Sequence, residues 1–163
     1  MTGGGSSIPE VQRLLAVLAA GRRAAEAGTA FGEGAAAMAR TAESVVTTEV
    51  DLARGAIAAE RLASFSNVEL LVGDWRELLP PRGPFGLVFL DGGGFKQAPD
   101  KHEGLVVSLL EPGGLLVMDD LTPGWPGFDP VRAWAANHPE LEAVEILTTP
   151  ATSALLVARR PAF

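Results

Sequence analysis

Acidic residues and glycines follow short apolar runs at several points of this sequence. Glu49 follows the run 45–48 and lies 21 positions after Gly28, which opens a glycine-containing segment. A carboxylate at the end of a second strand can accept hydrogen bonds from both hydroxyls of a ribose, and glycines let the backbone pass close to a ligand. Taken alone, Glu49 is equally consistent with a solvated acid, and Gly28 with a plain tight turn.

Asp74 and Trp75 follow a further apolar run at residues 68–72. Asp74 could accept a hydrogen bond from the amino group of an adenine, with Trp75 beside it as a stacking or wall residue. Asp74 also has the position of a helix N-cap ahead of Arg76, a common role for aspartate, and the two roles are compatible. The glycine segment and the two acids together predict a site for an adenosine-bearing ligand.

The composition is that of a globular protein of 163 residues, 47% hydrophobic, with a formal net charge of −7 and no cysteine. The length predicts a single domain over residues 1–163, with the Gly- and Ser-rich residues 1–6 disordered. The acidic balance argues against nucleic-acid binding, and no apolar run approaches the roughly 20 residues that span a bilayer. The lack of cysteine excludes a thiol nucleophile and fits a reducing compartment, so we expect a cytoplasmic protein that binds neither nucleic acid nor membrane.

Alternating strand and helix patterns must position these residues. Strands are predicted at 45–50, 68–72, 87–90 and 115–118, and helices at 34–41, 52–65, 102–110 and 131–137. Continuous apolar strands of this kind are typical of a parallel sheet covered on both faces. Two last strands at 142–147 and 153–158 predict a hairpin. We therefore expect an α/β fold, a Rossmann-like doubly wound sheet of seven strands that is mostly parallel and has a C-terminal antiparallel hairpin strand.

The N-terminal part gives weaker signals. Ser7 and Glu10 have the spacing of a capping box and predict a helix that ends near Gly21. The segment after Gly21 is rich in alanine and arginine, which favours a helix by propensity, and only its place in the alternating series predicts a strand. A second capping box is predicted further along, with Asp100 at the N-cap and Glu103 three residues later.

The successive motifs resemble those of class I S-adenosylmethionine (SAM)-dependent methyltransferases. They are 28–34, 48–51, Gly73-Asp74, 85–91 and the turn Leu110-Glu111-Pro112-Gly113-Gly114-Leu115. This turn is the most specific of them. It separates the family from nicotinamide-dependent dehydrogenases better than the glycine segment, which reads GxxxGxG rather than GxGxxG. The resemblance covers nearly the whole chain from about residue 7 and is closest to the catechol and caffeoyl-CoA O-methyltransferase branch.

The resemblance implies a cofactor site for SAM. In that branch a glutamate precedes the glycine turn, as Glu26 does here, and the acid that binds the ribose corresponds to Glu49. The residues expected to contact SAM are Glu26, Gly28, Thr29, Ala30, Phe31, Gly32, Gly34, Glu49, Val50, Gly73, Asp74, Trp75 and Asp91.

The resemblance also implies a metal site and catalytic residues. The branch holds a divalent metal with an aspartate after the fourth strand and an Asp-Asn pair after the fifth, which correspond to Asp91, Asp119 and Asp120. Oxygen ligands suit Mg²⁺, which would lower the pKa of a bound hydroxyl. Asp120 stands where the branch has asparagine. Lys96, the predicted catalytic residue together with Asp91, is out of register with the lysine of the branch. The alternative is that the three acids only cap loops and helices.

The predicted function is O-methylation of a small-molecule acceptor, with or without a metal. Two alternatives stay open: a catalytically inactive relative that acts as a binding protein, and a nicotinamide-dependent oxidoreductase. Only one helix is predicted ahead of the first strand, so we expect the chain to lack the N-terminal extension that covers the acceptor in that branch, and the apolar surface this would expose suggests a homodimer. Trp125 is equally consistent with a wall of the acceptor pocket and with a core anchor. Trp134 is expected to pack, and His102 and His138 to lie at the surface.

Overall fold

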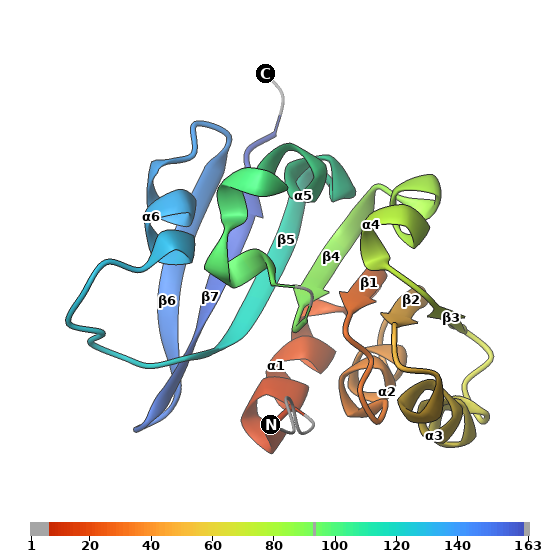
Figure 1. Cartoon of the computed structure of the whole chain (residues 1–163). Helices are drawn as coiled ribbons and strands as arrows, with labels where there is room; N and C mark the ends of the chain where they lie inside the picture. The colour runs from red at the N-terminus through yellow and green to blue at the C-terminus, as the bar shows by residue number, and fades with distance from the viewer. Residues whose placement is uncertain (1–6, 93, 162–163) are drawn as a thin grey trace.

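The computed structural model describes residues 7–92 and 94–161, so the predicted disorder of residues 1–6 lies outside the described residues. Seven strands form one sheet in the order β3-β2-β1-β4-β5-β7-β6 (Figure 1). They are β1 (Arg23–Ala27), β2 (Ser44–Glu49), β3 (Val68–Val72), β4 (Phe85–Leu90), β5 (Leu110–Leu121), β6 (Leu141–Thr149) and β7 (Thr152–Arg159).

The strand pairing is that of a doubly wound fold. Neighbouring strands from β3 to β5 are parallel, whereas β7 lies antiparallel to both β5 and β6. The chain moves outward from β1 to β3 and then returns to β4 on the other side of β1. Ligand sites of such sheets lie outside the carboxyl ends of the strands where the winding reverses, here between β1 and β4. The predicted α/β fold with its C-terminal hairpin is confirmed.

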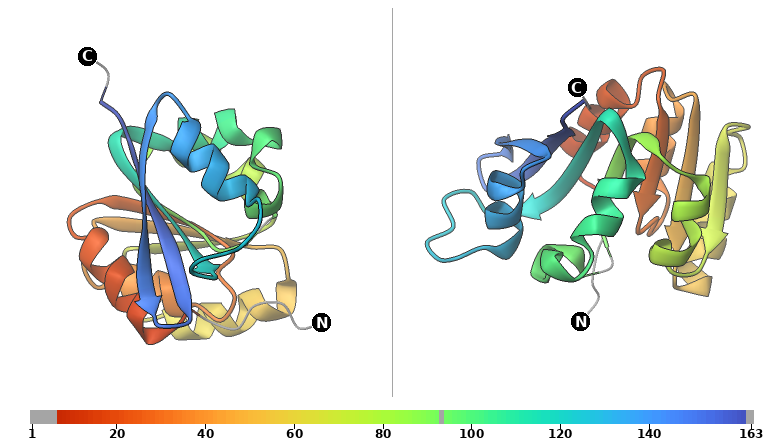
Figure 2. Two further views of the ribbon diagram at one scale, coloured as in Figure 1. Left: turned by 90° about the vertical axis from the view of Figure 1, so that its left-hand side faces the viewer. Right: turned by 90° about the horizontal axis from the view of Figure 1, so that it is seen from above.

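Helices cover both faces of the sheet (Figure 2). One face carries α1 (Pro9–Leu18), α2 (Glu33–Ala39) and α3 (Leu52–Leu62), and the other carries α4 (Trp75–Leu78), α5 (Glu103–Leu109) and α6 (Pro130–Asn137). Three short 3₁₀ helices are η1 (Pro80–Arg82), η2 (Phe95–Gln97) and η3 (Pro99–Lys101). None of the helices in the described ranges is long and apolar enough to cross a membrane.

The central strand β4 contributes to both hydrophobic cores. Leu87 and Phe89 belong to the cluster under α1, α2 and α3, whereas Val88 and Leu90 belong to the cluster under α4, α5 and α6. This alternation follows from the two-residue repeat of a strand, whose successive side chains point to opposite faces. All four side chains are buried, which explains why β4 reads as a continuous apolar run.

The alanine-rich segment after Gly21 forms β1 despite its helical propensity. Ala24, Ala25 and Ala27 are fully buried in the middle of the sheet, and β1 pairs with β2 on one side and β4 on the other. Arg23 stays exposed at the start of the strand and donates to the carbonyl oxygens of Arg82 and Pro84. Two parallel partners therefore override a local preference for helix.

The Pro-Gly-Gly turn is part of β5 rather than a loop before it. Phe85 pairs with Leu110 and Leu87 pairs with Leu115, so β5 has three more residues than β4 between the two pairs. A Cβ atom at Gly114 would lie 2.9 Å from the carbonyl oxygens of both Glu111 and Phe85. A glycine is required there because the backbone of the turn packs directly on β4.

Two of the predicted helix caps are wrong. Ile8 rather than Ser7 is the N-cap of α1, and it makes no side-chain capping bond. Asp100 lies inside η3, and α5 begins after His102 without a side-chain cap. Pro9 is the first residue of α1 and Pro99 the first residue of η3, a position that proline fits well, so neither Ser7 nor Asp100 directly precedes a helix.

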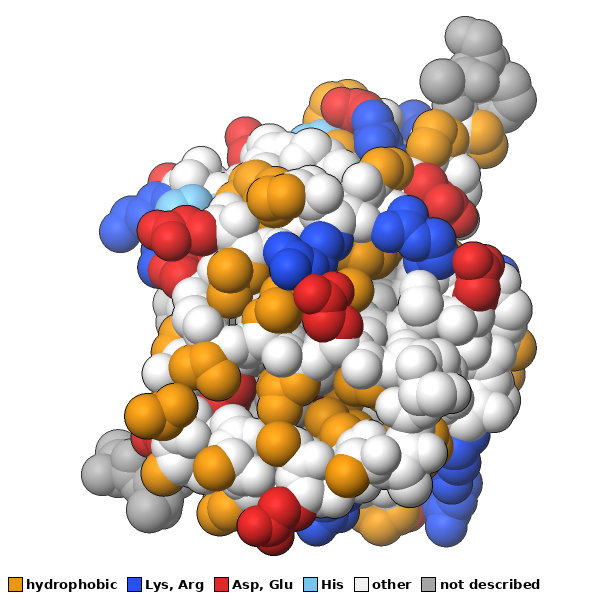
Figure 3. Space-filling model, turned by 90° about the vertical axis from the view of Figure 1, so that its right-hand side faces the viewer, with side chains coloured by type: hydrophobic (Ala, Val, Ile, Leu, Met, Phe, Trp, Pro, Cys, Tyr) orange, Lys and Arg blue, Asp and Glu red, His pale blue; other side chains and the backbone are white. Residues whose placement is uncertain are grey.

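Several large apolar side chains lie on the surface, among them Ile57 of α3 and Val72 of β3, which are about half exposed. Figure 3 views the molecule from the side of β3 and α3, where apolar side chains lie scattered among charged ones. Scattered exposure of this kind is normal for a protein surface. The homodimer therefore stays a prediction.

Candidate active site

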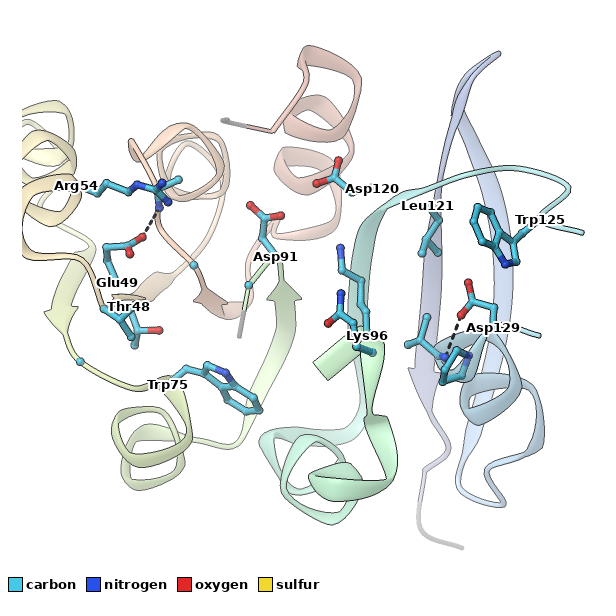
Figure 4. Close-up of a pocket in the computed structure, with 18 of the residues that line it drawn as sticks. Thr48, Glu49, Arg54, Trp75, Asp91, Lys96, Asp120, Leu121, Trp125 and Asp129 are labelled. Carbon is cyan, nitrogen blue, oxygen red and sulfur yellow. Dashed lines mark hydrogen bonds between the residues drawn. The ribbon is translucent and has the colours of Figure 1, made fainter. Parts of the chain in front are cut away.

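A cavity of about 850 Å³ lies at the carboxyl ends of the parallel strands, where the doubly wound fold places ligands (Figure 4). Nine of the sixteen predicted site residues line it: Gly28, Ala30, Glu49, Val50, Gly73, Trp75, Asp91, Lys96 and Asp120. The other seven lie outside its lining: Glu26, Thr29, Phe31, Gly32, Gly34, Asp74 and Asp119.

The cavity has two sides. The β2 side consists of Gly28, Ala30, Thr48, Glu49, Val50, Arg54, Gly73 and Trp75. The β5 side consists of Lys96, Gln97, Leu121, Trp125, Phe128, Asp129, Pro130 and Val131. Asp91, Gly92 and Asp120 complete the lining, and Figure 4 shows Asp91 between Glu49 on the β2 side and Trp125 on the β5 side.

The Glu49 carboxylate is held in place by the backbone. Its Oε2 accepts a hydrogen bond from the Ala30 N–H at 2.8 Å, and its Oε1 accepts one from the Asp51 N–H at 3.0 Å. Glu49 is only 5% exposed, so the alternative of a solvated acid is wrong. A carboxylate has about four acceptor sites, so the two backbone donors do not use the whole acceptor capacity of Glu49.

The turns after β1 and β4 are joined by backbone hydrogen bonds. The N–H groups of Gly28 and Thr29 both donate to the Thr48 carbonyl, and those of Asp91 and Gly92 both donate to the Ala27 carbonyl. These bonds tie the ends of three adjacent strands together. The wall of the cavity between β2 and β4 is therefore fixed by main-chain contacts.

Glu26 supports this wall from outside the lining. Thr47 Oγ1 donates to Glu26 Oε2 at 2.6 Å and lies 2.6 Å from Thr29 Oγ1, so Glu26 and the turn after β1 share one buried network. Burial raises the pKa of Glu26 well above its usual range, and the hydrogen bond from Thr47 only partly opposes this shift. The network places Thr29 behind the turn, where it orients the backbone.

Asp74 has the N-cap role predicted for it. Its side chain accepts from the backbone N–H of Arg76 at 2.9 Å and is also bound by the Arg76 guanidinium. These contacts, chiefly the side-chain hydrogen bond, lower the pKa of Asp74. Trp75 does line the cavity, and its buried Nε1 has no partner among the described residues. Direct contact between Asp74 and an adenine stays a prediction.

The three predicted metal ligands come together. Asp91, Asp119 and Asp120 each offer a carboxylate oxygen, and these atoms lie within 4.8 Å of one another. Between the pairs Met118–Leu155 and Leu121–Ser153, β5 has one more residue than β7, and Asp120 has a φ of 58° in the left-handed region. A bulge of this kind re-aims side chains near functional sites. It turns two consecutive residues of β5 toward Asp91.

Mutual repulsion and burial perturb this acidic cluster. Burial, followed by the charges of Asp91 and Asp120, raises the pKa of Asp119 to about 7. Burial and then the charge of Asp120 also raise the pKa of Asp91. Lys96 opposes both shifts, and its Nζ donates to the Asp119 backbone carbonyl at 2.7 Å. Three carboxyl groups that repel one another thus share the electrostatic influence of Lys96.

The donor set of the acidic cluster fits a hard divalent cation. It consists of carboxylate oxygens, the ligands that Mg²⁺ prefers. Asp119 Oδ1 is buried and has no hydrogen-bond partner among the described residues. Buried polar atoms of proteins are nearly always paired, so this oxygen has an unused capacity for a ligand.

Residues 25–121 match a family model described as a methyltransferase domain. The chain belongs to this methyltransferase domain family. The predicted resemblance to methyltransferases is confirmed, and the match favours neither an inactive relative nor a nicotinamide-dependent oxidoreductase. No match is found among curated proteins.

Solved structures share the methyltransferase fold. Rv0187 from MTB, solved with its cofactor, is 25% identical with a TM-score of 0.81, covering 96% of this chain and 83% of that chain. TomG from Streptomyces achromogenes, an O-methyltransferase in complex with SAM, is 24% identical with a TM-score of 0.73, covering 97% and 82%. The O-methyltransferase from Bacillus cereus, in complex with SAH, is 19% identical with a TM-score of 0.73, covering 98% and 84%. The last two likenesses show the fold alone.

Most of the lining residues that were not among the predicted site residues lie on the β5 side of this methyltransferase domain, although Thr48 and Arg54 on the β2 side were also missed. Trp125 is 54% exposed and lines the cavity, so its interpretation as a core anchor is wrong. Phe128 lines the same side and is 80% exposed. Two aromatic residues in a loop after a predicted strand were the available signal, because loops after strands carry specificity.

Trp134, His102 and His138 lie away from the cavity lining. Trp134 is 8% exposed and its ring meets that of Phe95 edge to face at 5.0 Å, which confirms its packing role. His102 lies beside Arg76 and Trp75, and His138 lies at the C-cap of α6. Neither histidine lines the cavity.

Proposed function

We propose that this methyltransferase domain binds SAM on the β2 side of the cavity and transfers its methyl group to a hydroxyl oxygen of a small molecule on the β5 side. The observation that carries the proposal is Glu49, a buried acid at the end of β2 whose two oxygens are oriented by backbone N–H groups. An acid in this place can bind both ribose hydroxyls. The names of TomG and the Bacillus cereus protein, and the SAM and SAH that they hold, support the cofactor and the oxygen acceptor.

The chain's own contribution is alignment and control of a proton. Bound SAM supplies a reactive methyl group on its sulfonium, so the protein mainly orients the acceptor and excludes water. Transfer forms an oxygen–carbon bond, breaks the sulfur–carbon bond and releases the hydroxyl proton of the acceptor. We assign orientation of the acceptor hydroxyl to Asp91, and uptake of its proton to Lys96 once that side chain has itself released a proton to solvent. Asp91 lies between the two sides, and Lys96 lies on the β5 side.

The acidic cluster is the proposed Mg²⁺ site. Asp91, Asp119 and Asp120 would hold the ion, and the unpartnered Oδ1 of Asp119 supports this. The ion would lower the pKa of an acceptor hydroxyl bound to it. Without a metal, Asp91 would position the cofactor or the acceptor through hydrogen bonds.

A small molecule is the acceptor that the cavity favours. A volume of about 850 Å³ lies in the ordinary range of small-molecule sites. The net charge of −7 does not supply the basic surface that a phosphate backbone needs.

Calorimetric titration with S-adenosylhomocysteine tests the cofactor site. We expect roughly micromolar binding, and a loss of about 100-fold in Glu49→Gln, which corresponds to about 2.7 kcal/mol. Glu69→Gln is the matched control, because Glu69 lies on the neighbouring strand β3, pairs with Arg82 and does not line the cavity. A folded wild-type protein that gives no heat, or equal loss in both variants, would contradict the site.

Turnover of SAM with phenols and aliphatic alcohols tests the reaction and the metal. We expect methylation that Mg²⁺ stimulates and EDTA suppresses, with Asp119→Asn insensitive to both. A turnover rate that neither Mg²⁺ nor EDTA changes would contradict the proposed metal site but not the proposed cofactor site. Binding of SAH without turnover of any acceptor would favour the inactive relative.

A further inference from the structure

The loop that joins β5 to α6, residues 122–129, presents two aromatic side chains to the cavity. Trp125 and Phe128 both line the β5 side, yet they are 54% and 80% exposed. Core packing of these side chains therefore contributes little to the position of the loop. The contacts that hold it lie at its two ends.

The guanidinium of Arg132, in the first turn of α6, contacts both ends of the loop. Its Nη2 donates to the Thr122 carbonyl at 2.7 Å, and its Nη1 pairs with Asp129 Oδ2 at 2.5 Å. Asp129 also caps α6, because its Oδ1 accepts from the backbone N–H groups of Val131 and Arg132 at 3.0 and 3.2 Å. One side chain thus closes the loop between its first and last residues.

The same guanidinium is anchored to the sheet. Arg132 Nε and Nη2 donate to the two carboxylate oxygens of Glu145 on β6 at 2.8 and 2.6 Å. Glu145 Oε1 also accepts from Ser153 Oγ at 2.5 Å, and the fully buried Ser153 pairs with Leu121 in the strand ladder. The contacts therefore run from the loop through β6 and β7 to the residue that follows Asp120.

This arrangement differs from an ordinary surface ion pair. The side chains of Arg132, Asp129 and Glu145 are 20%, 16% and 31% exposed, compared with 51% and 71% for the pair of Arg160 and Glu142. Exposed pairs contribute little, whereas a planar guanidinium can bind several partners in a fixed orientation. The bond from Arg132 also lowers the pKa of Glu145 to about 2, so the pair stays ionised near neutral pH.

We propose that Arg132 is the positioning residue of the acceptor site: it holds the loop so that Trp125 and Phe128 form the wall against which the acceptor binds. The proposal rests on the proposed function, because an acceptor must occupy the β5 side. The proposal predicts that substitution of Arg132 affects acceptor binding and cofactor binding differently. Loss of Arg132 weakens acceptor binding and leaves the cofactor affinity, which depends on the β2 side, unchanged.

The variants are Arg132→Met, which removes the guanidinium, and Arg132→Lys, which keeps the positive charge. A lysine ammonium cannot bind Thr122, Asp129 and Glu145 in the same fixed arrangement. Arg160→Met is the matched control, because it removes an arginine whose guanidinium pairs with Glu142 on the same strand β6 instead of with the loop. Thermal unfolding of each full-length variant establishes that it is folded.

Two measurements report the loop without any acceptor. Trp75 and Trp134 are 4% and 8% exposed, so acrylamide quenching of tryptophan fluorescence reports mainly Trp125. Chymotrypsin can cut after Phe128, whereas Pro126 protects the bond after Trp125. We expect cleavage after Phe128 about fivefold faster in Arg132→Met, which corresponds to about 1 kcal/mol, a smaller gain in Arg132→Lys and none in Arg160→Met.

The functional measurements are the KM for the best acceptor of the turnover panel and the Kd for S-adenosylhomocysteine. We expect the acceptor KM of Arg132→Met to rise about tenfold with the Kd within about twofold of wild type. Unchanged cleavage and quenching in Arg132→Met would overturn the proposal, and so would a parallel loss of cofactor and acceptor binding. If wild type binds no S-adenosylhomocysteine, the proposed function fails, and faster cleavage would still support the role of Arg132 in holding the loop.

Discussion

The two sides of the cavity are built in different ways. On the β2 side, the Glu49 carboxylate and the turn after β1 are fixed by backbone N–H groups and by the buried pair of Glu26 and Thr47. On the β5 side, exposed aromatic side chains lie on a loop whose ends are held by Arg132. A rigid β2 side suits a ligand that is always the same, such as the proposed cofactor. The β5 side can change its sequence without disturbing the sheet, as is usual where loops carry specificity.

This contrast predicts that residues on the β2 side contribute both to cofactor binding and to the stability of the fold, whereas the exposed loop residues on the β5 side contribute to acceptor binding alone. Substitutions in the buried network should change the free energy of unfolding. Substitutions of the exposed loop side chains Trp125 and Phe128 should change acceptor recognition and leave the free energy of unfolding almost unaffected, because these side chains are largely solvent-exposed.

The largest effect is expected for Gly34→Ala. A Cβ atom at Gly34 would lie 2.2 Å from Glu26 Oε1, in a site where Glu26 is 1% exposed and already bound by Thr47. We expect a loss of about 1–3 kcal/mol in unfolding free energy, measured by urea denaturation. Gly104→Ala is the control, because Gly104 is also the second residue of its helix and has no atom within 4 Å of the added Cβ. Equal stability of the two variants would mean that Glu26 moves freely, which would contradict a rigid β2 side.

A smaller effect is expected in the pH dependence of stability. The pKa of Glu26 is raised in the folded state, so the native protein binds more protons than the unfolded chain above the usual glutamate pKa of 4.5. The contribution of protonated Glu26 to the free energy of unfolding is therefore present at low pH and is lost as the pH rises through the pKa of Glu26 in the folded state. Glu26→Gln should reduce the fall in unfolding free energy between pH 5 and pH 8.

Glu69→Gln supplies the control of opposite sign. Arg82 lowers the pKa of Glu69, chiefly through a hydrogen bond, so the contribution of Glu69 is present above the usual pKa and is lost on acidification. A Glu26→Gln variant whose pH profile matches that of wild type would show that Glu26 is not responsible for the shift.

The smallest effect on stability is expected for Phe128→Ala. Phe128 is 80% exposed, so the free energy of unfolding of the variant should differ from that of wild type by no more than about 0.5 kcal/mol. Its Kd for S-adenosylhomocysteine should equal that of wild type, while its acceptor KM should rise. A large loss of stability in thermal unfolding would mean that the β5 side is as integral to the fold as the β2 side.

Most of the fold and half of the cavity could be predicted from local patterns. The strand β4 was visible as an apolar run because both of its faces are buried. Asp74 was recognisable as a cap because capping depends on a residue and its next few neighbours. The position of Glu49 after β2 follows from strand order, so its place at the cavity was predictable, whereas its two backbone donors were not.

Other features were beyond local reasoning. The alanines of β1 favour a helix, and only pairing with β2 and β4 makes them a strand. Trp125 could not be separated from a core residue, because its exposure depends on how the loop is held by Arg132, a residue whose partner Glu145 lies on another strand. Interactions between distant segments leave no local spacing that a sequence pattern could reveal.

The acidic cluster depends both on local sequence patterns and on the tertiary structure. The sequence alone determined that Asp91 follows the apolar run 87–90 and that Asp119 and Asp120 follow the run 115–118, because each run has to be a buried strand. Consecutive residues of a regular strand point to opposite faces, so the sequence alone does not bring Asp119 and Asp120 to one site. The extra residue of β5 opposite β7 and the left-handed backbone of Asp120 decide that they meet Asp91. That choice depends on the register between two strands, which the tertiary structure alone determines.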